Sequence, residues 1–262
     1  QLYPQLRHFR MTGGEPILDR NTYRVFDYVL ANPNPNLHLN VTSNFSVEPE
    51  LFEKYLTYVK NLCQTNIEHF MQYVSLDSTF AQAEYARHGL NFDRLWENVN
   101  RFLNEVPNRS SLTFIITMNN LNVTGFHSLI NSIHGLRQVY SKTYQRVWFD
   151  TPILRKPEWQ SLQLLPESYV DMLEAAWAFM ITKMEQPEHP FKGFKDYEAH
   201  RLQRVIDWMR EGSKLDPSYV KLQKANFYKF FKEHDRRRNT NFITTFPEMF
   251  EFWKECEYYA KN

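Results

Sequence analysis

Cysteine, glycine and long apolar runs are scarce in this sequence, and each scarcity excludes a class of protein. The 262 residues contain two cysteines, Cys63 and Cys256, which cannot build a disulfide framework. No apolar run approaches the ~20 residues that a membrane span needs, and no charged-then-apolar signal segment opens the chain. The net charge of +1 gives no global reason to expect binding to nucleic acid or to an anionic membrane. We therefore expect a cytoplasmic protein without a membrane partner.

Several common catalytic signatures are also missing. The nine histidines are scattered, and no His-Glu-x-x-His motif or Cys/His cluster indicates a hydrolytic metal site. The sequence has no Gly-Lys-Ser/Thr of a phosphate-binding P-loop, no three-glycine dinucleotide motif and no nucleophile elbow. Because only seven glycines are present, each paired glycine is informative.

What the sequence does contain is a regular alternation of strand and helix patterns over residues 1–155. The strand-like segments are 6–11, 37–42, 70–76, 112–117 and 146–154. Four helix-like segments lie between them. Asn21 can cap the first, and the others are 50–62, 92–103 and 123–133. Strands separated by helix-length crossovers pair in parallel, which predicts an α/β fold. The carboxyl ends of parallel strands share one rim, where ligands bind in such folds.

After residue 156 the strand patterns stop. Helical patterns cover 166–184, 197–211, 218–232 and 246–259, with prolines and glycines at the breaks. We therefore predict two domains, an α/β domain over 1–157 and an α-helical extension over 158–262.

The sequence Gly13-Gly14-Glu15-Pro16 directly follows the first predicted strand. Paired glycines let the backbone approach a ligand closely and present its amides and carbonyls. Glu15 adds a carboxylate, and such a turn suits an amino-acid-like ligand whose ammonium needs acceptors. Considered alone, these four residues favour an ordinary strand-to-helix turn.

The order of several strand-end segments makes the pattern more specific. Together with Gly13–Pro16, the chain resembles the radical S-adenosylmethionine (SAM) superfamily over about its first 160 residues. The matching segments are 41–44 (Val-Thr-Ser-Asn), 74–78 (Val-Ser-Leu-Asp-Ser), 85–92, 98–103, 116–122 and 149–157. Residues 235–242 and 246–248 resemble, more loosely, the C-terminal region of twitch-domain-containing radical SAM proteins.

The resemblance implies a TIM-like partial (β/α)6 barrel of parallel strands, here its strands 2–6, followed by the helical extension. It also implies roles at the strand ends. Gly13, Gly14, Glu15 and Pro16 would hold the methionine ammonium of SAM, and Arg87 would pair with its carboxylate. The remaining cofactor-binding residues would be Ser43 and Asn44, Ser75 and Asp77 near the ribose, and Asn119 and Ile153 near the adenine or ribose. Asp77 as a turn cap, Arg87 as a surface arginine and Ile153 as a core residue are the plainer alternatives.

The superfamily's cluster-binding loop is absent from this sequence. Radical SAM enzymes hold a [4Fe-4S] cluster with a Cys-x-x-x-Cys-x-x-Cys loop after the first barrel strand, and Cys63 and Cys256 lack that spacing. We expect the loop upstream of Gln1, in a segment cut away from this chain, rather than lost by a degenerate homologue. With it, an external electron donor and SAM would generate a 5′-deoxyadenosyl radical that abstracts hydrogen from a substrate. The resemblance leaves that substrate open between a small molecule, a peptide and an RNA base.

Two other functions compete with this interpretation. One is a non-catalytic SAM- or nucleotide-binding homologue, which the missing cysteines favour. The other is nucleic-acid binding by a basic cluster interleaved with aromatic residues, namely Lys229, Lys232, Arg236, Arg237 and Arg238. We expect that cluster to be a solvated helix face instead, and we expect no metal site within this chain.

Overall fold

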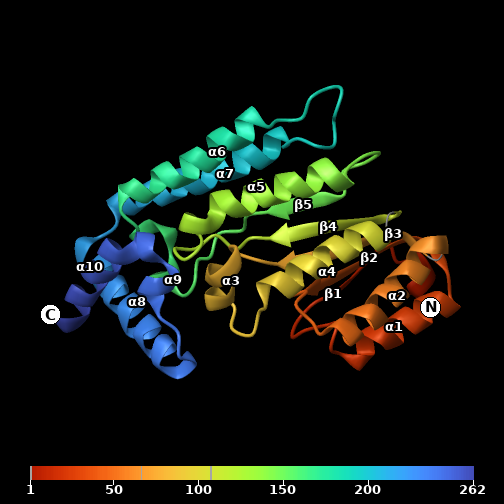
Figure 1. Ribbon diagram of the computed structural model, residues 1–262, viewed down its shortest axis with the longest axis horizontal. Coiled ribbons are helices and arrows are strands. Elements are labelled where there is room, and N and C mark those ends of the chain that lie inside the picture. Colours follow the sequence, from red (N-terminus) through yellow and green to blue (C-terminus); the bar gives the residue numbers. More distant parts are fainter. Residues whose placement is uncertain (1, 66, 107) are drawn as a thin grey trace. The chain divides into compact units, whose positions relative to one another are not determined.

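The computed structural model describes residues 2–65, 67–106 and 108–262 (Figure 1). The chain forms two compact units. Unit 1 comprises Gln1–Leu76, Gly89–Ile115 and Ile133–Asp150, and unit 2 comprises Asp77–His88, Ile116–Ser132 and Thr151–Asn262. Two internal segments thus belong to the same unit as the C-terminal helices, a division that sequence order alone does not indicate.

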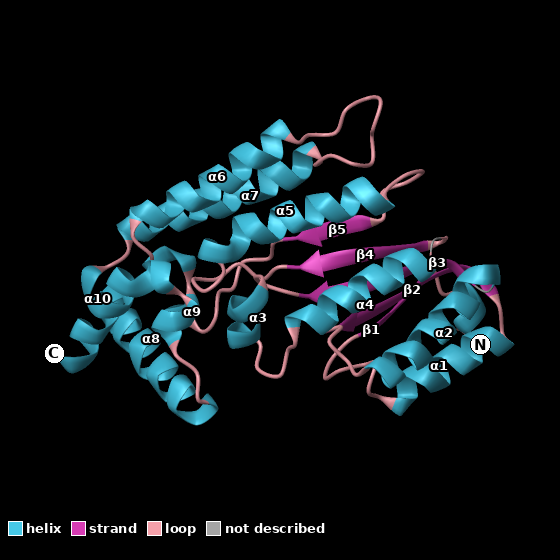
Figure 2. Cartoon of the chain, viewed as in Figure 1, coloured by secondary structure: helices cyan, strands magenta, loops and turns pink. Residues whose placement is uncertain are grey.

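Unit 1 is built on a parallel five-stranded sheet with the sequential strand order β1-β2-β3-β4-β5 (Figure 2). The strands are β1 (His8–Met11), β2 (Asn34–Ser43), β3 (Ile67–Ser75), β4 (Ser110–Ile115) and β5 (Val147–Asp150). The parallel α/β fold predicted from the alternating pattern is confirmed.

The helices of unit 1 lie on one face of this sheet. They are α1 (Arg20–Ala31), α2 (Pro49–Thr65), α4 (Phe92–Glu105) and the second part of α5 (Val123–Tyr140). Phe26 of α1, Tyr55 of α2 and Phe102 of α4 all contact the ring of Phe70 on β3, with centroid distances of 6.3, 6.4 and 6.3 Å. Right-handed crossovers between sequentially ordered parallel strands place every helix on the same side, which explains this arrangement.

The opposite side of β1–β3 is polar, and we call it the polar face. Along β2 and β3 buried residues alternate with half-buried ones, because successive side chains point to opposite faces. The polar face carries His8, Arg10, His38, Asn40, Thr42, His69, Met71, Tyr73 and Ser75. β4 differs, since residues 110–114 are all buried, as its nearly continuous apolar pattern predicts.

Unit 2 is helical apart from loops and isolated bridges among its described residues. Its helices are α3 (Phe80–Ala86), α6 (Val170–Thr182), α7 (Asp196–Arg210), α8 (Pro217–Arg238), α9 (Phe242–Thr245), α10 (Phe250–Lys261) and the first part of α5. The rings of Phe227 and Trp253 pack on Phe242, at centroid distances of 5.5 and 4.5 Å. This aromatic core joins α8, α9 and α10.

Short 3-10 helices complete the chain. They cover Tyr3–Gln5, Glu158–Gln160, Leu162–Leu164, Glu167–Tyr169, Glu211–Lys214 and Pro247–Met249. No helix among the described residues has both the length and the apolar character needed to cross a membrane.

Three local predictions are wrong. Asp19, not Asn21, caps α1, because its side chain accepts a hydrogen bond from the Asn21 N–H. Strand β2 begins at Asn34, whereas the predicted strand begins at residue 37. Helices α3 and α9 were not predicted, since seven and four residues are too few to show a helical period.

Candidate functional site

The turn after β1 adopts the conformation that its paired glycines allow. Gly13 and Gly14 have φ angles of +92° and +57°, in the left-handed region that other residues rarely enter. A Cβ atom at either position would meet no heavy atom within 4 Å. The glycines are therefore required by backbone conformation, and the space beside them is open.

Glu15 ties this turn to the end of the neighbouring strand. Its Oε2 accepts a hydrogen bond from the Asn44 N–H at 2.8 Å, and its Oε1 accepts one from the Ile17 N–H at 3.3 Å. A carboxylate that accepts backbone N–H groups is held in a fixed orientation. Two predicted segments, Gly13–Pro16 and Ser43-Asn44, are thus brought into contact within unit 1.

The end of β2 is a tight turn stabilised by its own side chains. Ser43 Oγ accepts a hydrogen bond from the Phe45 N–H at 2.8 Å, and Asn44 Oδ1 accepts one from the Ser46 N–H at 2.9 Å. Phe45 has a φ of +60°. Ser75, the last residue of β3, is half-buried on the polar face. The predicted residues of unit 1 therefore all lie at the carboxyl ends of β1, β2 and β3.

In unit 2, Asp77 and Arg87 form an ion pair. Arg87 Nε and Nη2 each lie 2.8 Å from Asp77 Oδ2, and Asp77 Oδ1 accepts a hydrogen bond from the Thr117 N–H at 2.8 Å. Burial raises the pKa of Asp77, while Arg87 and the Thr117 N–H oppose that rise. Asp77 is 7% exposed, so the guanidinium is its main charge partner.

Asn119 and Ile153 occupy neighbouring segments of the same unit. Asn119 Nδ2 donates to the Thr117 carbonyl at 2.7 Å, so the backbone of Thr117 links Asn119 to Asp77. Met118, beside Asn119, forms a parallel bridge with Ile153. Of the predicted cofactor residues, unit 2 thus organises Asp77, Arg87, Asn119 and Ile153 as one set.

Sequence reasoning missed Thr117 and Asn122, which support this set. Asn122 Nδ2 donates to the Thr117 carbonyl at 2.9 Å, and its Oδ1 accepts from the Asn119 N–H at 3.1 Å. The run Asn119-Asn120-Leu121-Asn122 is a usable signal, because asparagine side chains commonly close turns on the nearby backbone.

The cysteines of this chain do not fit an iron–sulfur cluster. Cys63 and Cys256 are both buried and belong to different units. Burial raises the pKa of the Cys63 thiol to about 12 and also raises that of Cys256, so neither is a ready thiolate ligand. Among the described residues, no group of three or more His, Cys, Asp or Glu side chains is arranged to hold a metal.

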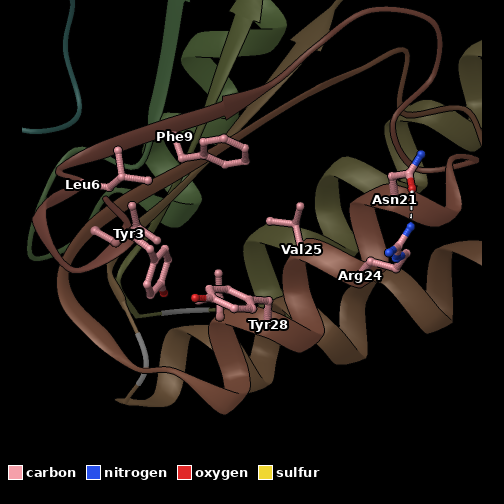
Figure 3. Close-up of a pocket in the computed structure, with 9 residues that line it drawn as sticks. Tyr3, Leu6, Phe9, Asn21, Arg24, Val25 and Tyr28 are labelled. Atoms are coloured by element: carbon pink, nitrogen blue, oxygen red, sulfur yellow. Dashed lines mark hydrogen bonds between the residues drawn. The ribbon is translucent and has the colours of Figure 1, made fainter. Parts of the chain in front are cut away.

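Two neighbouring pockets lie beside β1 in unit 1. A pocket of 370 Å³ lies between β1 and α1, where Figure 3 shows Tyr3, Leu6 and Phe9 on one side and Val25 and Tyr28 on the other. A second pocket of 230 Å³ reaches the Gly13 turn. The two pockets share Asn21 and Val25 in their linings, so they adjoin each other. β1 is the terminal strand of the sheet, and its outer edge pairs with no described strand.

The basic cluster of α8 is partly neutralised. Arg236 and Arg237 both form ion pairs with Glu233, at 2.6 Å. Of the aromatic residues interleaved with the cluster, Phe227, Tyr228 and Phe231 are buried, and Phe230 is 47% exposed and packs on Trp159. The arrangement is that of a helix with an apolar inner side and a charged outer side, and its suitability for nucleic acid stays untested.

Comparison of the chain with protein-family models, with curated proteins and with solved structures gave no match. The case for a function therefore depends on the residues and contacts described above.

Proposed function

We propose that this chain binds S-adenosylmethionine at the carboxyl ends of β1–β3, as part of a radical SAM enzyme. The observation that carries the proposal is the Glu15 carboxylate, which joins the positive-φ turn at Gly13-Gly14 to the Asn44 turn. That link leaves a conformationally fixed rim of backbone groups beside open space, which suits the ammonium and ribose of a small polar cofactor.

We infer further that the sheet of unit 1 is an arc of a partial (β/α)6 barrel. Two features support this inference, the sequential strand order and the placement of the unit 1 helices on one face. A doubly wound sheet reverses its strand order and carries helices on both faces, whereas a barrel does neither.

The cluster would have to come from residues outside this chain. We propose that a segment preceding Gln1 adds a strand along β1 and carries the three cysteines. The open edge of β1, the pocket between β1 and α1 and the adjoining pocket at the Gly13 turn support this placement. Such a cluster, supplied with electrons by an external donor, would reduce SAM. The residues described here would bind and orient the cofactor.

Photochemical crosslinking of SAM tests the location of the site. Ultraviolet irradiation of the chain with labelled SAM, followed by peptide mapping, should place the label within residues 11–17 or 42–47. Labelling confined to α6–α10 would contradict the proposal. A Glu15→Ala variant should lose the label, and Glu97→Ala, an exposed position on α4, should keep it.

A non-catalytic SAM-binding protein is the second candidate, favoured by the cysteine content of the chain. Reconstitution with iron and sulfide, followed by assay for 5′-deoxyadenosine, separates the candidates. The chain alone should form none. A longer product of the same gene that carries three upstream cysteines should form it, and failure of that longer product would favour the second candidate.

A further inference from the structure

Arg10 lies on the polar face of unit 1, two rows of same-face residues before Asn44 and Ser75 at the proposed cofactor site. The sheet register aligns Arg10 of β1 with Asn40 of β2, and aligns Thr42 with Tyr73 of β3. The Arg10 side chain nevertheless reaches Thr42 and Tyr73, two residues closer to the carboxyl ends of the strands than Asn40. The guanidinium therefore extends toward the rim that carries Gly13 and Asn44.

Neutral partners hold this guanidinium on two sides. Nε and Nη2 donate to Thr42 Oγ1 at 3.2 and 3.1 Å. The guanidinium carbon lies 4.1 Å from the centroid of the Tyr73 ring, a cation–π contact. Holding the planar group at one edge and one face fixes its orientation and leaves its outer N–H groups available.

Arg10 forms no ion pair with a described carboxylate, and Asp19, which lines the same pocket, accepts a hydrogen bond from the Asn21 N–H. The aligned residues of its row are Asn40, Met71 and Ser111, and those of the next row are Thr42, Tyr73, Thr113 and Trp148, so neither row contains a carboxylate. The side-chain amide of Asn40, a half-buried residue paired with Arg10 in the sheet, also makes no hydrogen bond with a described group. The guanidinium is held by neutral partners, and the unused Asn40 amide lies one row away on the same face. Together they offer an anionic oxygen group a positive charge and a further hydrogen-bond donor.

We propose that Arg10 and Asn40 bind a carboxylate or phosphate group of the substrate on which the SAM-dependent reaction acts. The assignment of this anion to a substrate rests on the proposed function. The anion site itself does not require bound SAM. The same chemistry has a second source, the methionine carboxylate of SAM, and the experiment below separates the two.

The test is a nuclear magnetic resonance titration of the chain with inorganic phosphate at constant ionic strength, with chloride as the reference anion. The Arg10 Nε–H and Asn40 Nδ2–H signals should shift together and saturate. In Arg10→Gln the Asn40 shift should require at least tenfold more phosphate, because a charge-assisted hydrogen-bonding partner is gone. Tyr73→Leu, which removes the supporting ring, should weaken binding to a smaller extent.

Arg24→Gln is the matched control. Arg24 lies on α1, where its Nη1 donates to Asn21 Oδ1, and the substitution should leave the phosphate titration unchanged. An Asn40 shift that persists in Arg10→Gln, or that Arg24→Gln also abolishes, overturns the anion site. Arg10→Lys keeps the charge without the planar fork, and should bind phosphate more weakly than the wild type while remaining folded.

SAM affinity of the same Arg10→Gln variant decides the source of the anion. Unchanged SAM affinity with lost phosphate binding supports a substrate site. A parallel loss of SAM affinity assigns Arg10 to the methionine carboxylate and overturns the substrate assignment. If the wild type binds phosphate but not SAM, the proposed function fails and the anion site stands.

Discussion

Glu15 is the residue on which the geometry of the proposed rim depends. Its carboxylate accepts hydrogen bonds from two backbone N–H groups, one in its own turn and one at the end of β2. One acceptor position on each carboxylate oxygen is therefore used by the backbone, and these two hydrogen bonds fix the position of the two turns. This differs from the role that its residue type suggests in the sequence, where a free acceptor for an ammonium is the simplest expectation.

Replacing Glu15 with alanine should lower the free energy of unfolding. Two N–H groups lose a charged acceptor, at a cost of about 1–3 kcal/mol. Urea denaturation followed by circular dichroism measures this cost. Glu97→Ala, at an exposed position without a described ion pair, serves as the control and should change stability little. Equal effects of the two substitutions would show that the Glu15 hydrogen bonds do not stabilise unit 1.

His69 should remain neutral to an unusually low pH. Burial, the neighbouring His38 and Arg146 lower its pKa from 6.5 to about 4, against an opposing effect of Glu68. Between pH 6.5 and about 4, this histidine is protonated in the unfolded chain but not in the folded chain. The free energy of unfolding therefore falls as the pH decreases through this range. Titration of the His69 ring signals by nuclear magnetic resonance measures the pKa. His69→Gln should flatten the pH dependence of stability in that window, and a pKa near 6.5 would contradict the prediction.

For single residues, the sequence predicts which residues shape a turn better than it predicts which side chains contact one another. The glycine pair follows from its position after a strand, and its positive φ angles agree with that expectation. The Asp77–Arg87 pair was not foreseen, because residues ten positions apart meet only through the tertiary path of the chain. Arg10 was overlooked for a similar reason: its partners Thr42 and Tyr73 lie on two other strands.

Strand β1 is the element whose environment says most about function. In a parallel ladder, alternate residues direct their backbone groups to opposite sides. The His38 N–H donates to the Arg7 carbonyl, so Phe9 and Met11 direct their N–H groups toward β2, and His8 and Arg10 direct theirs outward. An outer edge of this kind is the feature that an added strand would use.

Hydrogen exchange tests the state of that edge. The amides of Phe9 and Met11 should exchange slowly in the chain, and those of His8 and Arg10 should exchange faster. A longer product with an upstream strand should protect His8 and Arg10 as well. Strong protection of all four amides in the present chain would mean that another element already covers the edge.

Helix α5 contains two glycines in different surroundings, which makes it suitable for a paired test. Gly135 is exposed, and a Cβ atom there would meet nothing within 4 Å, whereas at Gly125 it would lie 2.0 Å from Ser78 Oγ. Gly135→Ala should stabilise the protein by about 0.5–1 kcal/mol, since alanine loses less backbone entropy in a helix. Gly125→Ala should not give this stabilisation, because the added Cβ would force the Ser78 side chain to move. Thermal unfolding of both variants measures the difference, and equal shifts would contradict the account.

Hydrophobic periodicity predicted the longer elements well, since all five strands and α1, α2, α4 and α5–α8 lie close to their expected positions. It failed where the periodic signal is short or ambiguous, as at α3, α9 and the start of β2. Long elements bury a full apolar side, and that side is visible in the sequence.

At the scale of the whole molecule, the predicted cofactor residues divide between the two units. Unit 1 carries those at the ends of β1–β3, and unit 2 carries the set linked through Thr117. The sequence placed each of these residues except Arg87 near a strand end, and it predicted a domain boundary at 157/158. Tertiary contacts group segments 77–88 and 116–132 with the C-terminal helices in one compact unit, and such contacts leave no periodic trace in the sequence.

Calorimetric titration of SAM into the chain tests the central claim most directly. We predict binding of one SAM per chain, weakened at least tenfold by Gly14→Val, because a β-branched residue resists the +57° φ of that position. Gly135→Ala should leave the affinity unchanged. Absence of binding at millimolar SAM, or equal affinity of Gly14→Val and the wild type, would contradict the claim that the Gly13–Pro16 turn forms a SAM site.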